Sequence, residues 1–115
     1  MLVKNYTDPI YLITTFESIG FKDGFVDLGD RRSVGFRYTF DCAEQTVLEN
    51  KCDINETIYD YAVIETIYPG LYQYADGEDR KFYKFNYDAN LYEQINEPFE
   101  LKDYIPIGGI GWVSC

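Results

Sequence analysis

Residues 57–68 read TIYDYAVIETIY, and this stretch decides the fold class. Isoleucine, valine, threonine and tyrosine dominate it, and these side chains fit the pleated surface of a sheet. The stretch therefore predicts a β-strand. Its faces are mixed, since Tyr59, Tyr61 and Glu65 alternate with Asp60 and Ile64. Neither face is purely apolar or purely polar.

The chain after this strand predicts an antiparallel meander. Pro69 and Gly70 interrupt the strand pattern, and two later clusters of Asp, Gly, Glu and Asn are typical of turns. The expected elements are a strand at 71–75, a turn at 76–79, a strand at 80–87, a turn at 88–90, a strand at 91–95, a helical turn at 99–104, a loop at 105–109 and an edge strand at 110–113.

The chain before this strand predicts one helix and one further strand. Asp8 and Pro9 suit a helix start, and apolar residues at helical spacing predict a helix over 9–19. Strict alternation predicts a strand over 33–40. Residues 42–56 favour an irregular or helical excursion, and a short strand at 46–48 is the alternative. The predicted fold is therefore α+β, with an N-terminal helix packed on a mainly antiparallel β-sheet, in a single domain spanning 1–115.

Negative charge is concentrated in the middle third of the chain. Residues 41–79 carry ten acidic side chains against the single base Lys51, a net charge of −9, whereas the flanks are close to neutral. The whole chain has a formal charge of −10. Such a field attracts basic partners and repels nucleic acid and anionic membranes. We therefore expect a basic protein as the partner, with no binding of nucleic acid or membrane.

The composition argues against most catalytic and metal chemistry. The 115 residues include no histidine, which removes the usual general base near neutral pH and the histidine-containing nucleophile pairs and zinc sites. Asp53 opens a calcium-loop pattern, but Ile58 and Ile64 occupy the positions that require glycine and glutamate. We expect no enzyme activity, no cofactor and no metal. Carboxylate-only catalysis or sugar binding on tyrosine platforms stays open as an alternative.

Three cysteines form no CxxC pair, and the first residues lack the charged-then-apolar plan of a signal peptide. These features predict reduced thiols and a cytoplasmic location. A bridge between Cys42 and Cys52 is the less favoured alternative. The chain is expected to be a monomer or a weak dimer.

Tyrosine accompanies the acidic residues. Nine of the twelve tyrosines follow residue 58, and tyrosine supplies a large ring with a polar tip, which suits protein interfaces as well as cores. Tyrosine next to carboxylate is therefore a plausible epitope for a basic protein. The candidate partner-binding residues are Asp53, Glu56, Tyr59, Asp60, Tyr61, Glu65, Tyr72, Tyr74, Asp76, Glu78 and Asp79.

The charge map also ranks the acids. Amide substitution within the acidic third is expected to slow association with the partner more than the same change in the N-terminal flank. The two sets are Glu65, Asp76, Glu78 and Asp79 against Asp8, Glu17, Asp23 and Asp27.

Residues 87–98, YDANLYEQINEP, resemble the hairpin-then-proline ending of several immunity proteins of bacterial toxin systems, including those of contact-dependent growth inhibition. The resemblance covers about a tenth of the chain. It implies a small acidic cytosolic protein that binds and neutralises a cognate toxin domain, most plausibly an RNase. The alternative is a phage-encoded mimic of nucleic acid that blocks a restriction or CRISPR effector, because it would use the same acids in the same physical way.

Overall fold

The computed structural model describes residues 9–50, 59–68, 74–102 and 107, and of residues 74–79 it describes the backbone alone. This part of the chain folds as a mainly antiparallel sheet with one α-helix, so the predicted α+β class is confirmed. The elements are β1 Ile10–Phe16, β2 Gly20–Lys22, β3 Phe25–Asp27, β4 Arg31–Arg37, α1 Phe40–Leu48, β5 Tyr61–Tyr68, β6 Tyr74–Asn86, β7 Leu91–Ile95 and the 3-10 helix η1 Phe99–Leu101.

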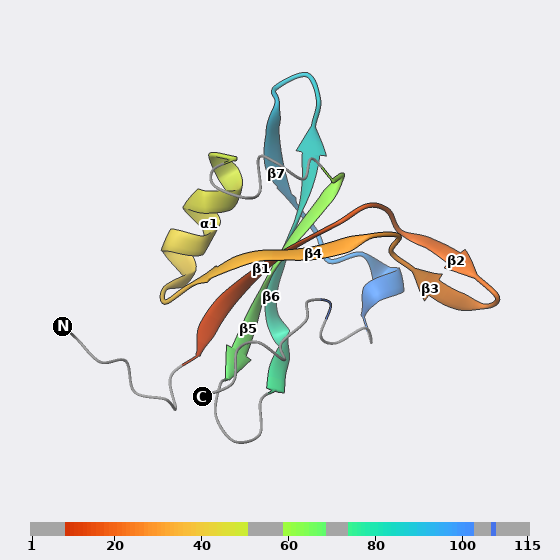
Figure 1. Cartoon of the computed structure of the whole chain (residues 1–115), viewed down its shortest axis with the longest axis horizontal. Coiled ribbons are helices and arrows are strands. Elements are labelled where there is room, and N and C mark those ends of the chain that lie inside the picture. Colours follow the sequence, from red (N-terminus) through yellow and green to blue (C-terminus); the bar gives the residue numbers. More distant parts are fainter. Residues whose placement is uncertain (1–8, 51–58, 69–73, 103–106, 108–115) are drawn as a thin grey trace.

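Five strands form the central sheet in the order β4-β1-β5-β6-β7, and every neighbouring pair is antiparallel. The strands β2 and β3 pair only with each other and form a separate two-stranded ribbon. Figure 1 shows α1 on one side of the sheet and this ribbon projecting from the other. The ribbon continues the chain between β1 and β4, so its base lies beside the ends of both strands.

The predicted helix over 9–19 is wrong, because Ile10–Phe16 is the strand β1. Its sequence IYLITTF is rich in β-branched and aromatic side chains, which favour strands over helices. The strand pairs on both sides, with β4 and β5, and six of its seven residues are buried. A strand buried on both faces shows no clean alternation, and its apolar residues therefore also matched a helical spacing.

The helix instead lies mid-chain, at Phe40–Leu48, and overlaps the segment 42–56, where an irregular or helical excursion was favoured. Thr39 begins it, because its hydroxyl accepts a hydrogen bond from the backbone N–H of Cys42 at 3.2 Å. Ala43 and Val47 lie one turn apart on its buried face and pack against the sheet. Residues 51–56 of the same predicted excursion lie outside the described residues.

The strands predicted at 57–68 and 91–95 are confirmed over Tyr61–Tyr68 and Leu91–Ile95. The strand predicted at 33–40 is confirmed over residues 33–37, since β4 is Arg31–Arg37 and Phe40 already begins α1. The predicted turn at 76–79 is wrong, because β6 runs through it. Glu65 pairs with Arg80 and the next residue pairs with Asp76, so three residues of β6 have no partner in β5. The strand absorbs the turn-forming sequence as a bulge.

The C-terminal predictions are confirmed where the structure describes them. A turn precedes β7, with Asn90 at a positive φ of 59°, and η1 follows Pro98. The edge strand predicted at 110–113 lies outside the described residues.

Buried side chains form three clusters, of which the smallest consists of Ile10, Leu12 and Ile67. Ile13, Ile64 and Tyr83 belong to the core beneath α1. On the opposite face, Phe16 and Phe82 belong to a second core. The second core also includes Leu28 from the loop after β3, Leu101 from η1, and Ile107.

Candidate functional site

The structure describes the side chains of four of the eleven predicted partner-binding residues. Asp53, Glu56 and Tyr72 lie outside the described residues. Tyr74, Asp76, Glu78 and Asp79 belong to the backbone of β6, and their side chains also lie outside the description. The four described side chains are those of Tyr59, Asp60, Tyr61 and Glu65.

Glu65 is not available to a partner, because its side chain is fully buried in the sheet. Its Oε2 accepts a hydrogen bond from the backbone N–H of Ile107 at 2.7 Å and lies 3.7 Å from Nη1 of Arg80. A buried carboxylate is stable only with such internal partners. Glu65 therefore belongs to the fold, and its place in the predicted epitope is corrected.

Arg80 connects this buried carboxylate to the C-terminal residues. Its Nε donates to Oε1 of Glu97 at 2.7 Å, and its Nη2 donates to the carbonyl oxygen of Leu101 at 2.5 Å. From β4, Nη1 of Arg31 donates to the carbonyl oxygen of Ile107 at 3.2 Å. The side chains of Arg31 and Glu65 thus bind the carbonyl oxygen and the N–H of Ile107, and they hold this residue against the second core.

Asp60 and Tyr61 stand at the start of β5 and face opposite sides of the sheet. Tyr61 stacks on Phe16, with ring centroids 5.2 Å apart and planes 8° from parallel, on the side away from α1. Asp60 faces the other side, where its Oδ1 accepts a hydrogen bond from the hydroxyl of Tyr87. The two side chains therefore have different surroundings, and their predicted role in binding a partner stays a prediction.

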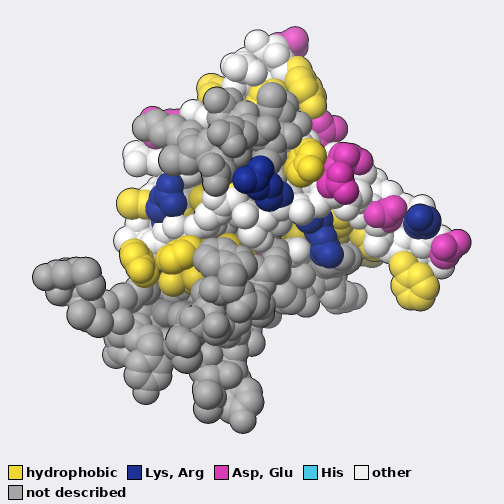
Figure 2. Space-filling view, viewed as in Figure 1, with side chains coloured by type: hydrophobic (Ala, Val, Ile, Leu, Met, Phe, Trp, Pro, Cys, Tyr) yellow, Lys and Arg dark blue, Asp and Glu magenta, His cyan; other side chains and the backbone are white. Residues whose placement is uncertain are grey.

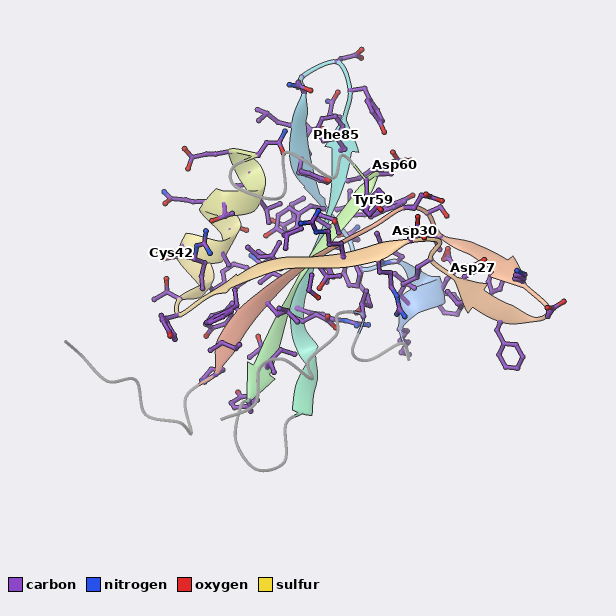
Figure 3. The ribbon with its side chains drawn as sticks, in the orientation of Figure 1. Asp27, Asp30, Cys42, Tyr59, Asp60 and Phe85 are labelled. Carbon is purple, nitrogen blue, oxygen red and sulfur yellow. The ribbon has the colours of Figure 1, made fainter. Side chains whose placement is uncertain are left out.

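Tyr59 and the backbone of Asp60 hold the start of β5 against the β6–β7 hairpin. The hydroxyl of Tyr92 donates to the carbonyl oxygen of Tyr59 at 2.6 Å. The backbone N–H of Phe85 donates to the carbonyl oxygen of Asp60 at 2.7 Å. Figure 3 shows Tyr59, Asp60 and Phe85 together beside this hairpin. The carboxylate of Asp60 is therefore held on a paired and well-packed backbone.

Three carboxylates lie next to the ends of three neighbouring strands. Phe16, the last residue of β1, pairs with the first residues of β4 and of β5. Glu17 follows Phe16, while Asp30 and Asp60 immediately precede β4 and β5. The backbone N–H of Glu17 donates to the carbonyl oxygen of Asp30 at 3.0 Å. We call Asp30, Glu17 and Asp60 the acidic row.

Asp27 extends the acidic row towards the ribbon, as the labelled side chains in Figure 3 show. Its Oδ1 accepts a hydrogen bond from the backbone N–H of Gly29 at 2.9 Å. Gly29 has a φ of +67°, and a Cβ atom there would lie 2.8 Å from Oε1 of Glu17. Glycine is required at this turn on both counts. The turn brings the end of β3 against the carboxylate of Glu17.

No ion pair within the described part of the chain includes these acids. The ion pairs there involve Glu44, Glu65 and Glu97, and neither the acidic row nor Asp27 takes part in one. Asp27, Asp30 and Glu17 are exposed, and Asp60 is half-buried. Glu17 and Asp27, assigned from sequence to the neutral flank, thus belong to this group of exposed acids without an ion pair.

Three tyrosines have pKa values moved away from neutral pH. Burial raises the pKa of Tyr83 and of Tyr92, and a hydrogen bond to Glu44 at 2.7 Å raises that of Tyr83 further. The hydrogen bond to Asp60 raises the pKa of Tyr87. Each shift keeps the phenol protonated, whereas a general base has to be unprotonated near neutral pH in order to accept a proton. These tyrosines therefore act as hydrogen-bond donors.

Comparisons with protein-family models, curated proteins and solved structures found no significant match. Among the residues described, no group of three or more Cys, Asp or Glu side chains is placed to hold a metal ion. No helix in the described ranges has the length and apolar character needed to cross a bilayer. The functional proposal therefore rests on the residues of this chain.

Proposed function

We propose that this protein binds and neutralises a basic protein, as an immunity protein neutralises its cognate toxin domain. The single observation that carries the proposal is the acidic row, whose carboxylates have no ion pair in the described part of the chain. Like charges gathered at the ends of neighbouring strands repel one another. A cationic partner that docks there would relieve this repulsion.

The chemistry of the row suits an enzyme that binds polyanions. A group of exposed carboxylates can engage the Lys and Arg side chains that a nuclease uses for successive phosphates. The net charge of −10 adds long-range attraction, which speeds encounter and makes it sensitive to salt. The proposed target is a basic toxin nuclease of the RNase class, and the proposed mode is occlusion of its active site.

The proposed compartment is the cytoplasm. Cys42 is an exposed free thiol in the structure, and exposed thiols persist in reducing compartments.

The first experiment identifies the partner. The wild-type chain, immobilised, is used to capture proteins from the source cell at low salt, and captured proteins are identified by mass spectrometry. A basic nuclease whose activity falls on titration to a 1:1 ratio supports the proposal. A restriction or CRISPR effector as the captured target would replace immunity with mimicry of nucleic acid, and capture of no basic protein would contradict both.

The second experiment tests the site. The variant E17Q/D30N/D60N removes three charges from the acidic row, and D41N/D88N/E93Q removes three from exposed acids of α1, the β6–β7 turn and β7. We expect the row variant to slow association with the captured nuclease about tenfold at low salt. Equal association rates for the two variants would remove the row from the interface.

A further inference from the structure

The β2–β3 ribbon is the most exposed apolar element among the described residues. Its turn consists of Asp23 and Gly24, both at positive φ, 54° and 81°. Two consecutive residues at positive φ form a tight turn whose twist matches that of the paired strands. The ribbon projects beyond the sheet in Figure 1, with its turn furthest out.

Two phenylalanines on the ribbon face solvent. Phe21 is 68% exposed and Phe25 is 77% exposed. Phe21 pairs with Val26, whereas Phe25 pairs with Lys22, so the two rings lie on opposite faces of the ribbon. A flat surface could cover one ring but not both. An occupant that buries both rings has to receive the ribbon in a cleft.

The base of the ribbon is fixed in the second core. Leu28 is buried there, and Ile19 and Val26 are half-buried against the same cluster. These residues share a face with Phe21, because side chains two apart on a strand, and those of directly paired residues, point the same way. The apolar face thus runs from the core outwards to the exposed ring of Phe21. The projecting end is held in position before any partner binds.

Charge indicates which occupant fits. Asp23 and Asp27 lie on the ribbon and Glu17 and Asp30 at its base, together with Lys22 on the ribbon and with Arg31 and Arg32 at the start of β4. This end of the molecule therefore carries four acids against three bases, and the chain as a whole carries a charge of −10. Figure 2 shows acidic side chains along this end of the molecule, with an exposed apolar side chain at the tip. A second copy would bring another chain of charge −10 against these acids. A basic partner gains from the same contact.

We propose that the β2–β3 ribbon is the anchor of the interface, and that Phe21 and Phe25 insert into a cleft of the basic partner bordered by cationic side chains. The inference rests on the proposed function and deepens it, because it assigns attraction of the partner and retention of the partner to two different groups of residues. The acidic row attracts the partner and sets the association rate, while the two rings retain it and set the dissociation rate.

The test uses the basic nuclease captured by the wild-type chain, purified, and measures both rate constants by surface plasmon resonance. F21A and F25A are compared with F99A, which removes a ring that is 84% exposed in η1. We expect F21A and F25A each to speed dissociation about thirtyfold, the size of an anchor residue's contribution. F99A should leave dissociation unchanged. All three rings are exposed, so circular dichroism and the unfolding midpoint should match wild type.

The outcomes separate the two proposals. If E17Q/D30N/D60N slows association while F21A and F25A leave dissociation unchanged, the proposed function stands and the ribbon is not the anchor. If no basic protein is captured, both fail. A concentration-dependent dimer of the free chain in sedimentation, abolished by F21A or F25A, would assign the ribbon to self-association and overturn the inference.

Discussion

Glu65 and Glu17 show two opposite uses of the same side chain on neighbouring strands. Glu65 is buried and has Arg80 and the backbone of Ile107 as partners. Glu17 is exposed beside Asp30 and Asp60, and no ion pair within the described residues includes it. A carboxylate with internal partners stabilises the fold, whereas a carboxylate among like charges is free to bind a cationic partner.

Removal of the buried carboxylate should have the largest effect on stability. Glu65→Ala leaves Arg80 in the core with its pairing reduced to Glu97, and it leaves the N–H of Ile107 without its acceptor. We expect a loss of about 3–5 kcal/mol in the free energy of unfolding, measured by urea denaturation. Glu97→Ala, the matched control, should cost about 1 kcal/mol because Glu97 is partly exposed. Equal losses for the two variants would contradict the contrast between buried and exposed carboxylates.

Glu44 is an intermediate case, and alkaline pH tests it. Its carboxylate accepts a hydrogen bond from the hydroxyl of Tyr83. The pKa of Tyr83 in the folded protein is raised above its ordinary value of about 10. Above pH 10 the unfolded chain releases a proton that the folded chain keeps, so stability present below that pH is lost as pH rises. We expect the free energy of unfolding to fall by about 1.4 kcal/mol per pH unit for this phenol.

Tyr83→Phe removes the titrating hydroxyl and serves as the control for this slope. Tyr92 also has a raised pKa and contributes the same sign, so its slope should persist in the variant. Urea denaturation at several pH values from 9 to about 11.5 gives the two slopes. Identical slopes for wild type and Tyr83→Phe would show that this buried hydrogen bond does not control the proton.

Neutralising the acidic row should have the smallest and opposite effect on stability. E17Q/D30N/D60N removes like-charge repulsion at the ends of neighbouring strands, and we expect a gain of up to about 1 kcal/mol. The D41N/D88N/E93Q variant should stay within about 0.5 kcal/mol of wild type. Thermal unfolding at low salt measures both. A loss of stability in the row variant would mean that these carboxylates support the fold, and the contrast with Glu65 would disappear.

Local sequence signals predicted the elements that show alternating polar and apolar residues or that follow a clear turn residue. The alternation at 33–40 and the Asn90 turn before β7 both led to elements that the structure contains. The strand β1 was missed because it is buried on both faces and has no alternation to read. The ribbon carried a readable signal in Asp23 and Gly24 between short apolar stretches, which is typical of a tight hairpin.

The sequence indicated the type of partner, a basic protein, but not which acidic residues are exposed to it. The excess of acid and the absence of histidine pointed to binding of a basic protein, and that remains the proposal. Sequence placed Glu65 in the epitope and Glu17 outside it. The net charge of a segment depends only on residues that are close along the chain. Glu17, Asp30 and Asp60 are far apart in sequence and come near one another because β1 pairs with β4 and β5.

The sequence by itself determined the net charge, the lack of histidine and the α+β class, because these follow from composition and from periodicity within single segments. Only the tertiary structure decided which acids are structural and which face solvent. Burial and pairing depend on residues from distant segments, such as Ile107 with Glu65, or Asp30 with Glu17. Whether a carboxylate has a partner is a property of the assembled sheet, and no single segment contains that information.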